Sequence, residues 1–338
     1  MKAVYITEFG GPENLELRDV PEPREPRGSD VLLKVLATGL NRADLLQVRG
    51  HYPPPDGYSP NIPGLEFAGE VAATGSDVRN WLPGDRVFGI TAGEAQAEYL
   101  TTHESLLAAI PDNLSFTEAA AVPEVFITAH DACFTQCELK QNETLLIHAI
   151  GSGVGLAALQ LAKANETTVI GTSRTAEKLE RCMEFGLDLG IATSDVGPQA
   201  ASLRVEQQFA EKVMEFTGGH GVDVILDLVG AAYFEQNLAC LAAKGRLILV
   251  GLTSGSKAEF DLGVALRKRA RIIGTMLRGR SIEEKTDATQ RFVDKVVSLL
   301  VSGEVRPNID RIFAVEDVVA AYEYLGSNES FGKVVLKF

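Results

Sequence analysis

The stretch Thr144–Lys178, TLLIHAIGSGVGLAALQLAKANETTVIGTSRTAEK, decides the fold of a large part of this chain. It opens with an apolar run, Leu145–Ala149, which predicts a buried strand. A turn with three glycines follows, and then the small-residue spacing of a helix that packs closely on a sheet. A second apolar strand is expected over Thr168–Thr172. Strand, glycine turn, helix and strand in this order are typical of a nucleotide-binding unit.

The glycine turn departs from the usual GxGxxG pattern. If Gly155 is the last glycine of that pattern, Ile150 and Ser152 occupy the first two glycine positions. The start of the helix still offers free backbone N–H groups and the positive end of the helix dipole. We therefore expect a pyrophosphate at Ser152, Gly153 and Val154.

The residues after the second strand predict the cofactor. A chain that binds NAD usually has Asp or Glu there for the ribose 2′-hydroxyl, whereas this chain has Ser173 and Arg174, with Lys178 one helical turn later. These side chains favour a 2′-phosphate, so the sequence predicts NADPH. The alternative is that Arg174 and Lys178 belong to an ordinary solvated helix start.

Composition indicates a globular chain and restricts its partners. The 338 residues suit two domains, with 45% hydrophobic and 23% charged residues. The 32 basic against 46 acidic residues give a net charge of −14, which argues against nucleic acid and anionic membranes as partners. No secretory leader is visible, so we expect a cytoplasmic protein. Residues 144–162 carry no charge, but His148 and the glycine turn interrupt what could pass for a membrane span.

The four cysteines are scattered and form no CxxC motif. Reduced thiols fit this pattern best. Cys133 and Cys137 lie four apart on an expected helix, where we expect core residues rather than metal ligands.

The two halves of the chain differ in the secondary structure that their sequences predict. Short strands separated by proline and glycine are expected over the first hundred residues and suggest a partly open barrel. From Ser115 onward strands and helices alternate, which predicts an α/β domain with a doubly wound parallel sheet. In the helix that begins this part, Thr117 is the expected cap. The expected elements are strands at Met1–Ile6, Leu15–Arg18, Asp30–Ala37, Leu189–Ala192, Val222–Gly230, Gly245–Gly251 and Ala270–Met276, helices at Ala176–Phe185, Glu206–Thr217, Tyr233–Ala242 and Ile282–Gly303, and a last helix and closing strand within Val315–Phe338.

Several motifs in order resemble the zinc-free quinone oxidoreductases of the medium-chain dehydrogenase/reductase superfamily, the zeta-crystallin-like group. The resemblance covers essentially the whole chain. It rests on GGPENLELRDVPEP near the start, LNRADLLQVRGHYPPP (Leu40–Pro55), IPGLEFAGEV (Ile62–Val71), HAIGSGVG, VDVILDLVG and the final FGKVVLKF. It implies a GroES-like catalytic domain, residues 1–122 and 277–338, interrupted by a Rossmann NADPH-binding domain, residues 123–276. It also implies a homodimer or homotetramer that associates through edge strands of the Rossmann sheet.

The resemblance further implies that no metal is bound. Zinc-dependent alcohol dehydrogenases of this superfamily have a cysteine where this chain has Asn41, and a His-Glu pair where it has Leu65 and Glu66. No cysteine lies between Gly84 and His103, so the structural zinc lobe is missing too. Glu66 is expected to accept hydrogen bonds from backbone or arginine.

Without a metal, the expected reaction is reduction of a quinone, because its reduced anion is stabilised by resonance and the protein mainly has to align two rings. Asn41 and Tyr52 are the expected catalytic residues at the substrate cleft. The residues expected at the nicotinamide end of the cofactor are Asn41, Thr128, Gly251, Leu252 and Lys333. Asn41 as a turn residue, Tyr52 as a half-buried aromatic and Thr128 as a helix hydroxyl bonded to its own backbone remain alternatives.

Two further polar residues are expected to be structural. Asp44 is interpreted as a first-turn acid on a helix, and His148 as a packed residue that fixes the glycine loop. Two other functions stay open. One is NADPH-dependent reduction of α,β-unsaturated ketones or aldehydes, for which Tyr52 would be the proton donor. The other is a protein that only holds the cofactor and has a binding or structural role.

Overall fold

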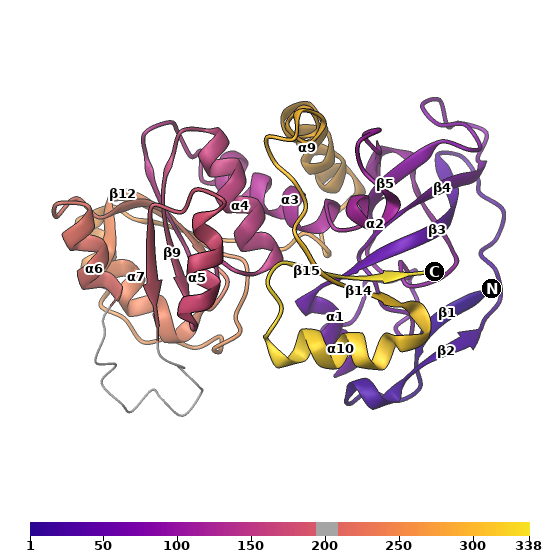
Figure 1. Ribbon diagram of the computed structural model, residues 1–338, viewed down its shortest axis with the longest axis horizontal. Helices are drawn as coiled ribbons and strands as arrows, with labels where there is room; N and C mark the ends of the chain where they lie inside the picture. The colour runs from indigo at the N-terminus through magenta and orange to yellow at the C-terminus, as the bar shows by residue number, and fades with distance from the viewer. Residues whose placement is uncertain (194–208) are drawn as a thin grey trace. The chain divides into compact units, whose positions relative to one another are not determined.

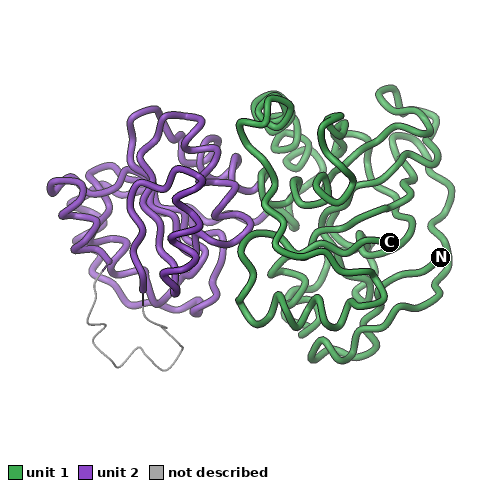
Figure 2. The backbone as a smooth tube through the Cα atoms, in the orientation of Figure 1, with its two compact units in different colours: residues 1–127, 277–338 green, residues 128–276 purple. Residues whose placement is uncertain are grey.

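The computed structural model describes residues 1–193 and 209–338, which form two compact units (Figure 2). The first unit comprises residues 1–127 and 277–338, and the second comprises residues 128–276. The chain therefore leaves the first unit, completes the second and returns to the first. No helix among the described residues combines the length and apolar character needed to cross a membrane.

The described residues of the first unit form a seven-stranded, mostly antiparallel sheet and a separate two-stranded sheet. The larger sheet has the order β14-β15-β3-β4-β5-β7, with β6 paired to β3. Figure 1 shows β15, the last strand, lying along β3 from the start of the chain. The strands are β1 (Lys2–Ile6), β2 (Leu15–Asp19), β3 (Asp30–Leu40), β4 (Glu66–Thr74), β5 (Arg86–Ile90), β6 (Tyr99–His103), β7 (Leu107–Ala109), β14 (Ile309–Ala314) and β15 (Lys333–Lys337).

Strand β3 changes partners along its length, and this positions the site. Asp30–Lys34 pairs with β6, whereas Ala37–Leu40 pairs with β15, and β4 pairs with β3 from Val31 to Ala37. Val334 lies opposite Leu40, so Lys333 comes next to the point where β3 ends and α1 (Arg42–Val48) begins.

The helices of the first unit are α1, α2 (Phe116–Ala119), the first part of α3 (Pro123–His130), α9 (Ile282–Ser302) and α10 (Val318–Ser327). Of these, α2 and α9 begin with a capping box. The cap of α2 is Ser115, so the expectation of Thr117 is wrong. Ser115 accepts from the Glu118 N–H at 3.3 Å, and Glu118 Oε2 accepts from the Ser115 N–H at 2.9 Å. This reciprocal pair requires the glutamate three residues after the cap, a spacing that Thr117 does not have.

The second unit contains the expected doubly wound parallel sheet. Its order in the described residues is β10-β9-β8-β11-β12-β13, and every pairing is parallel. The order reverses beside β8, so the strand that leads into the glycine turn lies at the switch point, where ligands bind in such sheets. The elements are β8 (Thr144–Ile147), α4 (Gly153–Ala164), β9 (Thr168–Ser173), α5 (Ala176–Met183), β10 (Leu189–Ala192), α6 (Phe209–Phe216), β11 (Val222–Asp227), α7 (Phe234–Cys240), β12 (Leu241–Leu249), α8 (Leu262–Lys268) and β13 (Arg271–Gly274).

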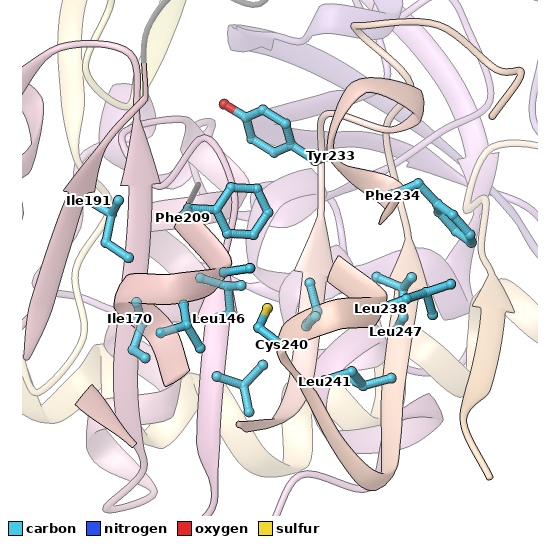
Figure 3. Close-up of a cluster of buried hydrophobic side chains, with 14 residues drawn as sticks. Leu146, Ile170, Ile191, Phe209, Tyr233, Phe234, Leu238, Cys240, Leu241 and Leu247 are labelled. Atoms are coloured by element: carbon cyan, nitrogen blue, oxygen red, sulfur yellow. The ribbon is translucent and has the colours of Figure 1, made fainter. Parts of the chain in front are cut away.

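One face of this sheet carries an apolar cluster (Figure 3). Leu146, Ile170 and Leu247 come from three strands of the sheet and are fully buried. Phe209 begins α6 and packs on the same face. Tyr233 lies at one end of the cluster and directs its hydroxyl away from it, where it donates to Thr193 Oγ1 at 2.7 Å. The apolar strand positions of the sequence are thus the ones that hold this unit together.

Some elements differ from the expectation. Leu241 and Ala242 belong to strand β12 rather than to the preceding helix, because β12 is long and its first residue pairs with Val222. Helix α8 and strand β14 lie in stretches for which no element was expected. Of the helix expected over Glu206–Thr217, residues 206–208 lie outside the described residues.

The four cysteines are free thiols, as expected, and all four are buried, which includes the expected core residues Cys133 and Cys137. Burial raises the pKa of Cys137, Cys182 and Cys240 to about 12. They are therefore unreactive thiols at neutral pH.

Candidate functional site

The glycine turn forms an anion site at the start of α4. Ser152 caps the helix, because its Oγ accepts from the Gly155 N–H at 3.2 Å. The N–H groups of Gly153 and Val154 have no acceptor among residues 1–193 and 209–338. Two unpaired amides at the positive end of a 12-residue helix can bind a phosphate oxygen.

Close packing explains the unusual residues of this turn. A Cβ on Gly155 would lie 2.5 Å from the Ile150 carbonyl oxygen, so only glycine lets α4 approach the end of β8. Ile150 itself fills the space beside Gly171 on β9, and its N–H donates to the Thr172 carbonyl at 3.0 Å. Ile150 occupies a position where the usual pattern has a glycine. Here it packs between the start of α4 and strand β9.

The end of β9 carries the residues expected at the adenosine ribose. Ser173 is 7% exposed, and its Oγ accepts from the Thr175 N–H at 3.3 Å. Arg174 is exposed, and Lys178 lies half-buried in the first turn of α5. A hydroxyl and two cationic side chains at this strand end suit a phosphate monoester better than a bare ribose hydroxyl.

A buried polar chain fixes the strand ends around the glycine turn. His148 Nδ1 lies 2.8 Å from Thr172 Oγ1, and its Nε2 lies 2.6 Å from Asn237 Oδ1. Asn237 Nδ2 in turn donates to Asp227 Oδ2 at 3.0 Å. Since Asn237 Oδ1 can only accept, Nε2 of His148 carries the proton. Burial lowers the pKa of His148, so it is neutral and acts as the packed residue that the sequence predicts.

Three of the residues expected around the nicotinamide, Thr128, Gly251 and Leu252, lie in the second unit. Gly251 follows β12, and its N–H donates to the Asp227 carbonyl at 3.2 Å. Leu252 is 50% exposed and borders a hollow of about 160 Å³ that Phe234 and Phe260 also line. Thr128 lies half-buried in α3.

In the first unit, Lys333 is the centre of a buried polar cluster. Its Nζ donates to the Leu40 carbonyl at 2.6 Å, to Asn41 Oδ1 at 2.7 Å and to Glu66 Oε1 at 2.6 Å. Glu66 is fully buried and Lys333 is 3% exposed. All three ammonium protons thus have protein acceptors, so Lys333 holds the end of β3 against β4.

Asn41 bridges the two members of this ion pair. Its Nδ2 donates to Glu66 Oε1 at 2.8 Å, while its Oδ1 accepts from Lys333. Glu66 Oε2 accepts from the Glu124 N–H at 2.8 Å. Glu66 is therefore a structural acceptor for backbone, as expected, but its cationic partner is a lysine and not an arginine. The described ranges contain no group of three or more His, Cys, Asp or Glu side chains able to hold a metal ion.

Asp44 organises the start of α1. It is fully buried, and its carboxylate accepts from the N–H of Asn41 at 2.7 Å and of Gly64 at 3.1 Å. Burial raises the pKa of Asp44 to about 6, although these two N–H groups and the charges of Lys333 and Arg278 oppose the rise. The interpretation as a first-turn acid fits this position.

Tyr52 is held by an arginine that sequence reasoning missed. Arg278 donates to the Tyr52 carbonyl at 2.8 Å, to the Ala92 carbonyl at 2.7 Å and to Gln47 Oε1 at 2.6 Å. Its guanidinium also lies 5.1 Å from the centre of the Tyr52 ring. Glu124 and Lys285 were missed as well, because nothing in a helical pattern distinguishes a buried charged residue from an exposed one.

Comparisons with known proteins give a consistent result. The family models "Alcohol dehydrogenase GroES-like domain" and "Zinc-binding dehydrogenase" match residues 27–133 and 153–294. A quinone oxidoreductase of Pseudomonas aeruginosa is 33% identical over 99% of both chains. The structure of an Escherichia coli quinone oxidoreductase complexed with NADPH is similar over the whole of both chains, at 29% identity and a TM-score of 0.85. The CurK enoyl reductase is similar over 99% of this chain and 98% of that one, at 25% identity and a TM-score of 0.84.

Proposed function

Because the chain belongs to the quinone oxidoreductase family of the medium-chain dehydrogenases/reductases, we propose that it transfers reducing equivalents from NADPH to a quinone without zinc. The observation that carries this proposal is the anion site at the start of α4. The unpaired amides of Gly153 and Val154 suit a pyrophosphate, and Ser173, Arg174 and Lys178 suit a 2′-phosphate.

The residues present fit NADPH and divide its binding among them. Gly155 leaves room for the backbone to pack closely below the pyrophosphate, and Ser152 holds the first turn of α4 in place. We assign Thr128, Gly251 and Leu252 to the nicotinamide end. When bound, NADPH supplies a hydride at its nicotinamide ring.

Residues of the first unit would place and protonate the quinone. The Tyr52 hydroxyl offers a hydrogen bond to a quinone oxygen, and Arg278 holds the Tyr52 backbone in position. Asn41 contributes mainly through the cluster with Glu66 and Lys333, because both ends of its amide are already hydrogen-bonded. We assign Lys333 to the same cluster, where it supports Asn41 and Glu66. A direct hydrogen bond from Lys333 to the cofactor would break one of its three hydrogen bonds within the protein.

A second candidate is reduction of an α,β-unsaturated ketone or aldehyde. The similarity to the CurK enoyl reductase favours keeping it, since hydride addition to carbon uses the same cofactor site. The two reactions differ in one requirement, because the enolate formed from an enone must receive its proton at carbon.

The experiment is steady-state NADPH oxidation under anaerobic conditions with a panel of quinones and a panel of enones. We expect quinones to give the higher kcat/KM. Higher values for enones would support the second candidate. Tight NADPH binding without turnover on either panel would favour a cofactor-holding protein.

We further propose a cytoplasmic homodimer or homotetramer that associates through β13. This strand is one of the two outer edges of the parallel sheet in the described part of the chain, and its Ile272 is 41% exposed. Leu262 and Leu266 on neighbouring α8 are 72% and 77% exposed. An open strand edge beside apolar side chains suits pairing with a second copy. Residues 1–122 with 277–338 would form the catalytic domain and residues 123–276 the NADPH-binding domain.

A further inference from the structure

Four buried polar side chains link the ends of three neighbouring strands in the second unit. Thr172 lies on β9, His148 directly follows β8, Asp227 ends β11 and Asn237 lies on α7. Each of them is at most 1% exposed. A buried polar network in which every member is hydrogen-bonded rigidifies the segments that it joins.

Each hydrogen bond of this chain of side chains has one possible direction. A carboxylate only accepts, so Asn237 presents its Nδ2 to Asp227 and its Oδ1 to His148. The His148 Nε2 therefore donates, and its Nδ1 accepts from the Thr172 hydroxyl at 2.8 Å. The His148 ring thus fixes which way the Asn237 amide faces.

Asp227, at the far end of the chain, holds the two loops that follow β11 and β12. Its Oδ1 accepts from the Val229 N–H at 2.7 Å and from the Gly230 N–H at 2.9 Å. Its carbonyl oxygen accepts from the Gly251 N–H at 3.2 Å, at the start of the second loop. The position of this one residue therefore sets the start of both loops.

The two loops lie directly against each other. A Cβ on Gly230 would lie 3.1 Å from the Leu252 Cα. The Ser254 N–H donates to the Val229 carbonyl at 2.8 Å. A shift of the Asp227 carboxylate would therefore displace Leu252 together with Gly230.

The near end of the chain is held independently by the sheet. Thr172 pairs with Ile191 on β10, so strand pairing fixes its backbone whatever its side chain contacts. Ser173 and Arg174, which we assign to the 2′-phosphate, directly follow it. Loss of the His148 hydrogen bonds would therefore loosen the loops after β11 and β12 but leave the adenosine end of the site in place.

We propose that His148 and Asn237 are positioning residues for NADPH, which hold Asp227 and, through it, the loop that carries Gly251 and Leu252. This inference rests on the assignment of those two residues to the nicotinamide end in the proposed function. It requires that loss of the chain weaken binding of the nicotinamide half of the cofactor and leave binding of the adenosine half unchanged.

Two substitutions at His148 separate hydrogen bonding from packing. The His148 ring packs against Phe209 and Tyr233, with ring centres 5.0 Å and 4.8 Å away. His148→Phe keeps an aromatic ring for these contacts but removes both hydrogen bonds. His148→Gln loses the ring, but its amide can donate to Asn237 and accept from Thr172. A packing role therefore favours the phenylalanine, whereas a positioning role favours the glutamine.

Binding of two ligands measures the effect. NADPH occupies both ends of the site, whereas 2′,5′-ADP carries the adenosine and the 2′-phosphate but no nicotinamide. In His148→Phe the Kd for NADPH, from a fluorescence titration, should rise about five- to tenfold because the loop is no longer fixed. The Kd for 2′,5′-ADP, from isothermal titration calorimetry, should not change. In His148→Gln both values should equal those of the wild type.

His103→Phe is the matched control. His103 lies half-buried in the first unit, where its Nδ1 is 2.8 Å from Ser105 Oγ. The substitution removes a contact between a histidine and a hydroxyl, like that of His148 with Thr172, but outside the second unit. Whatever its effect on the Tm, it should leave the Kd for both ligands unchanged.

Thr172→Val gives the same test with a smaller change, should His148→Phe prevent folding. Valine has nearly the shape of threonine, so only the hydroxyl that directs the His148 ring is lost. The Kd for NADPH should rise by a smaller factor than in His148→Phe, again without a change in the Kd for 2′,5′-ADP.

Three results would overturn the inference. They are wild-type affinity of His148→Phe for NADPH, an equal loss of affinity for both ligands, and tighter NADPH binding by His148→Phe than by His148→Gln. The test needs no turnover, so it is separate from the test of the proposed function. A wild type that binds NADPH but reduces no quinone would reject quinone reduction and leave this inference standing. A wild type that does not bind NADPH would overturn both.

Discussion

At the scale of a single residue, Arg174 is the residue to which we assign the preference for NADPH. It lies exposed directly after β9, where its guanidinium can form a charge-assisted hydrogen bond to a 2′-phosphate. Arg174→Glu should raise the KM for NADPH strongly, because an interaction of about 1.5–3 kcal/mol becomes a repulsion. The KM for NADH should stay the same or fall. Steady-state kinetics with both cofactors measure this, and NADH serves as the internal control. An equal loss with both cofactors would reject the assignment.

Tyr52 allows the hydroxyl and the ring to be tested separately. Arg278 binds the Tyr52 carbonyl and not its hydroxyl, so Tyr52→Phe leaves that contact intact. Tyr52→Phe should lower kcat/KM for the quinone five- to tenfold, equivalent to about 1 kcal/mol, with NADPH binding unchanged. Tyr52→Ala should cost more, since it also removes the ring that faces the Arg278 guanidinium.

Quinone kinetics and a fluorescence titration with NADPH separate the possible roles of Tyr52. Wild-type kinetics in both variants would show that the residue only packs. Equal weakening of NADPH binding in both would place it at the cofactor instead.

At the scale of the element, the start of α4 depends on one glycine. A Cβ at Gly155 would lie 2.5 Å from the Ile150 carbonyl oxygen, a backbone atom that cannot move aside easily. Gly155→Ala should therefore push α4 from β8 and destabilise the protein by about 1–3 kcal/mol. The midpoint of urea unfolding followed by circular dichroism measures this.

Gly326→Ala is the control for Gly155→Ala. Gly326 lies within α10, and nothing lies within 4 Å of the position of an added Cβ. The same substitution should stabilise the protein there by up to about 1 kcal/mol, because alanine favours a helix over glycine. A stable Gly155→Ala variant would show that the close approach of α4 is not needed.

The cluster around Lys333 also depends on the arrangement of elements. The end of strand β3 pairs with β15 while β4 lies on its other side, and this arrangement brings Lys333 next to Asn41 and Glu66. The sequence identified these three positions through motifs in three separate stretches. It did not indicate that they bind one another, since Glu66 and Lys333 are 267 residues apart in the chain.

At the scale of the whole molecule, the prediction is independence from metal. Asn41 and Leu65 lack the thiolate and the imidazole that bind zinc in related alcohol dehydrogenases, and Lys333 already supplies a cation to Glu66. The purified protein should contain no stoichiometric zinc by elemental analysis and should keep its quinone reductase activity after exhaustive chelation. Activity that chelation abolishes and zinc restores would overturn the mechanism.

The sequence by itself determined the fold class, the parallel sheet, the glycine turn and the residues expected at the cofactor. These features depend on local periodicity and on the chemistry of turns, which neighbouring residues carry in full. It did not determine the beginning of β12, the presence of α8 and β14, or the cap of α2. Pairing with other strands decides where β12 begins and forms β14, and the geometry of one local hydrogen-bond pair decides the cap of α2.

Only the tertiary structure decided which charges are buried and which groups they face. Lys285 and Glu124 are residue types that usually lie in solvent on a helix. Arg278 follows a strand, and nothing in the neighbouring sequence indicates that it is buried. Burial and partners set the pKa of a carboxyl or an ammonium, and both depend on segments far apart in the chain. For this reason the sequence could propose Asn41 and Tyr52 for the site, whereas the ion pair of Glu66 with Lys333 and the contact of Arg278 with Tyr52 became visible only in the folded chain.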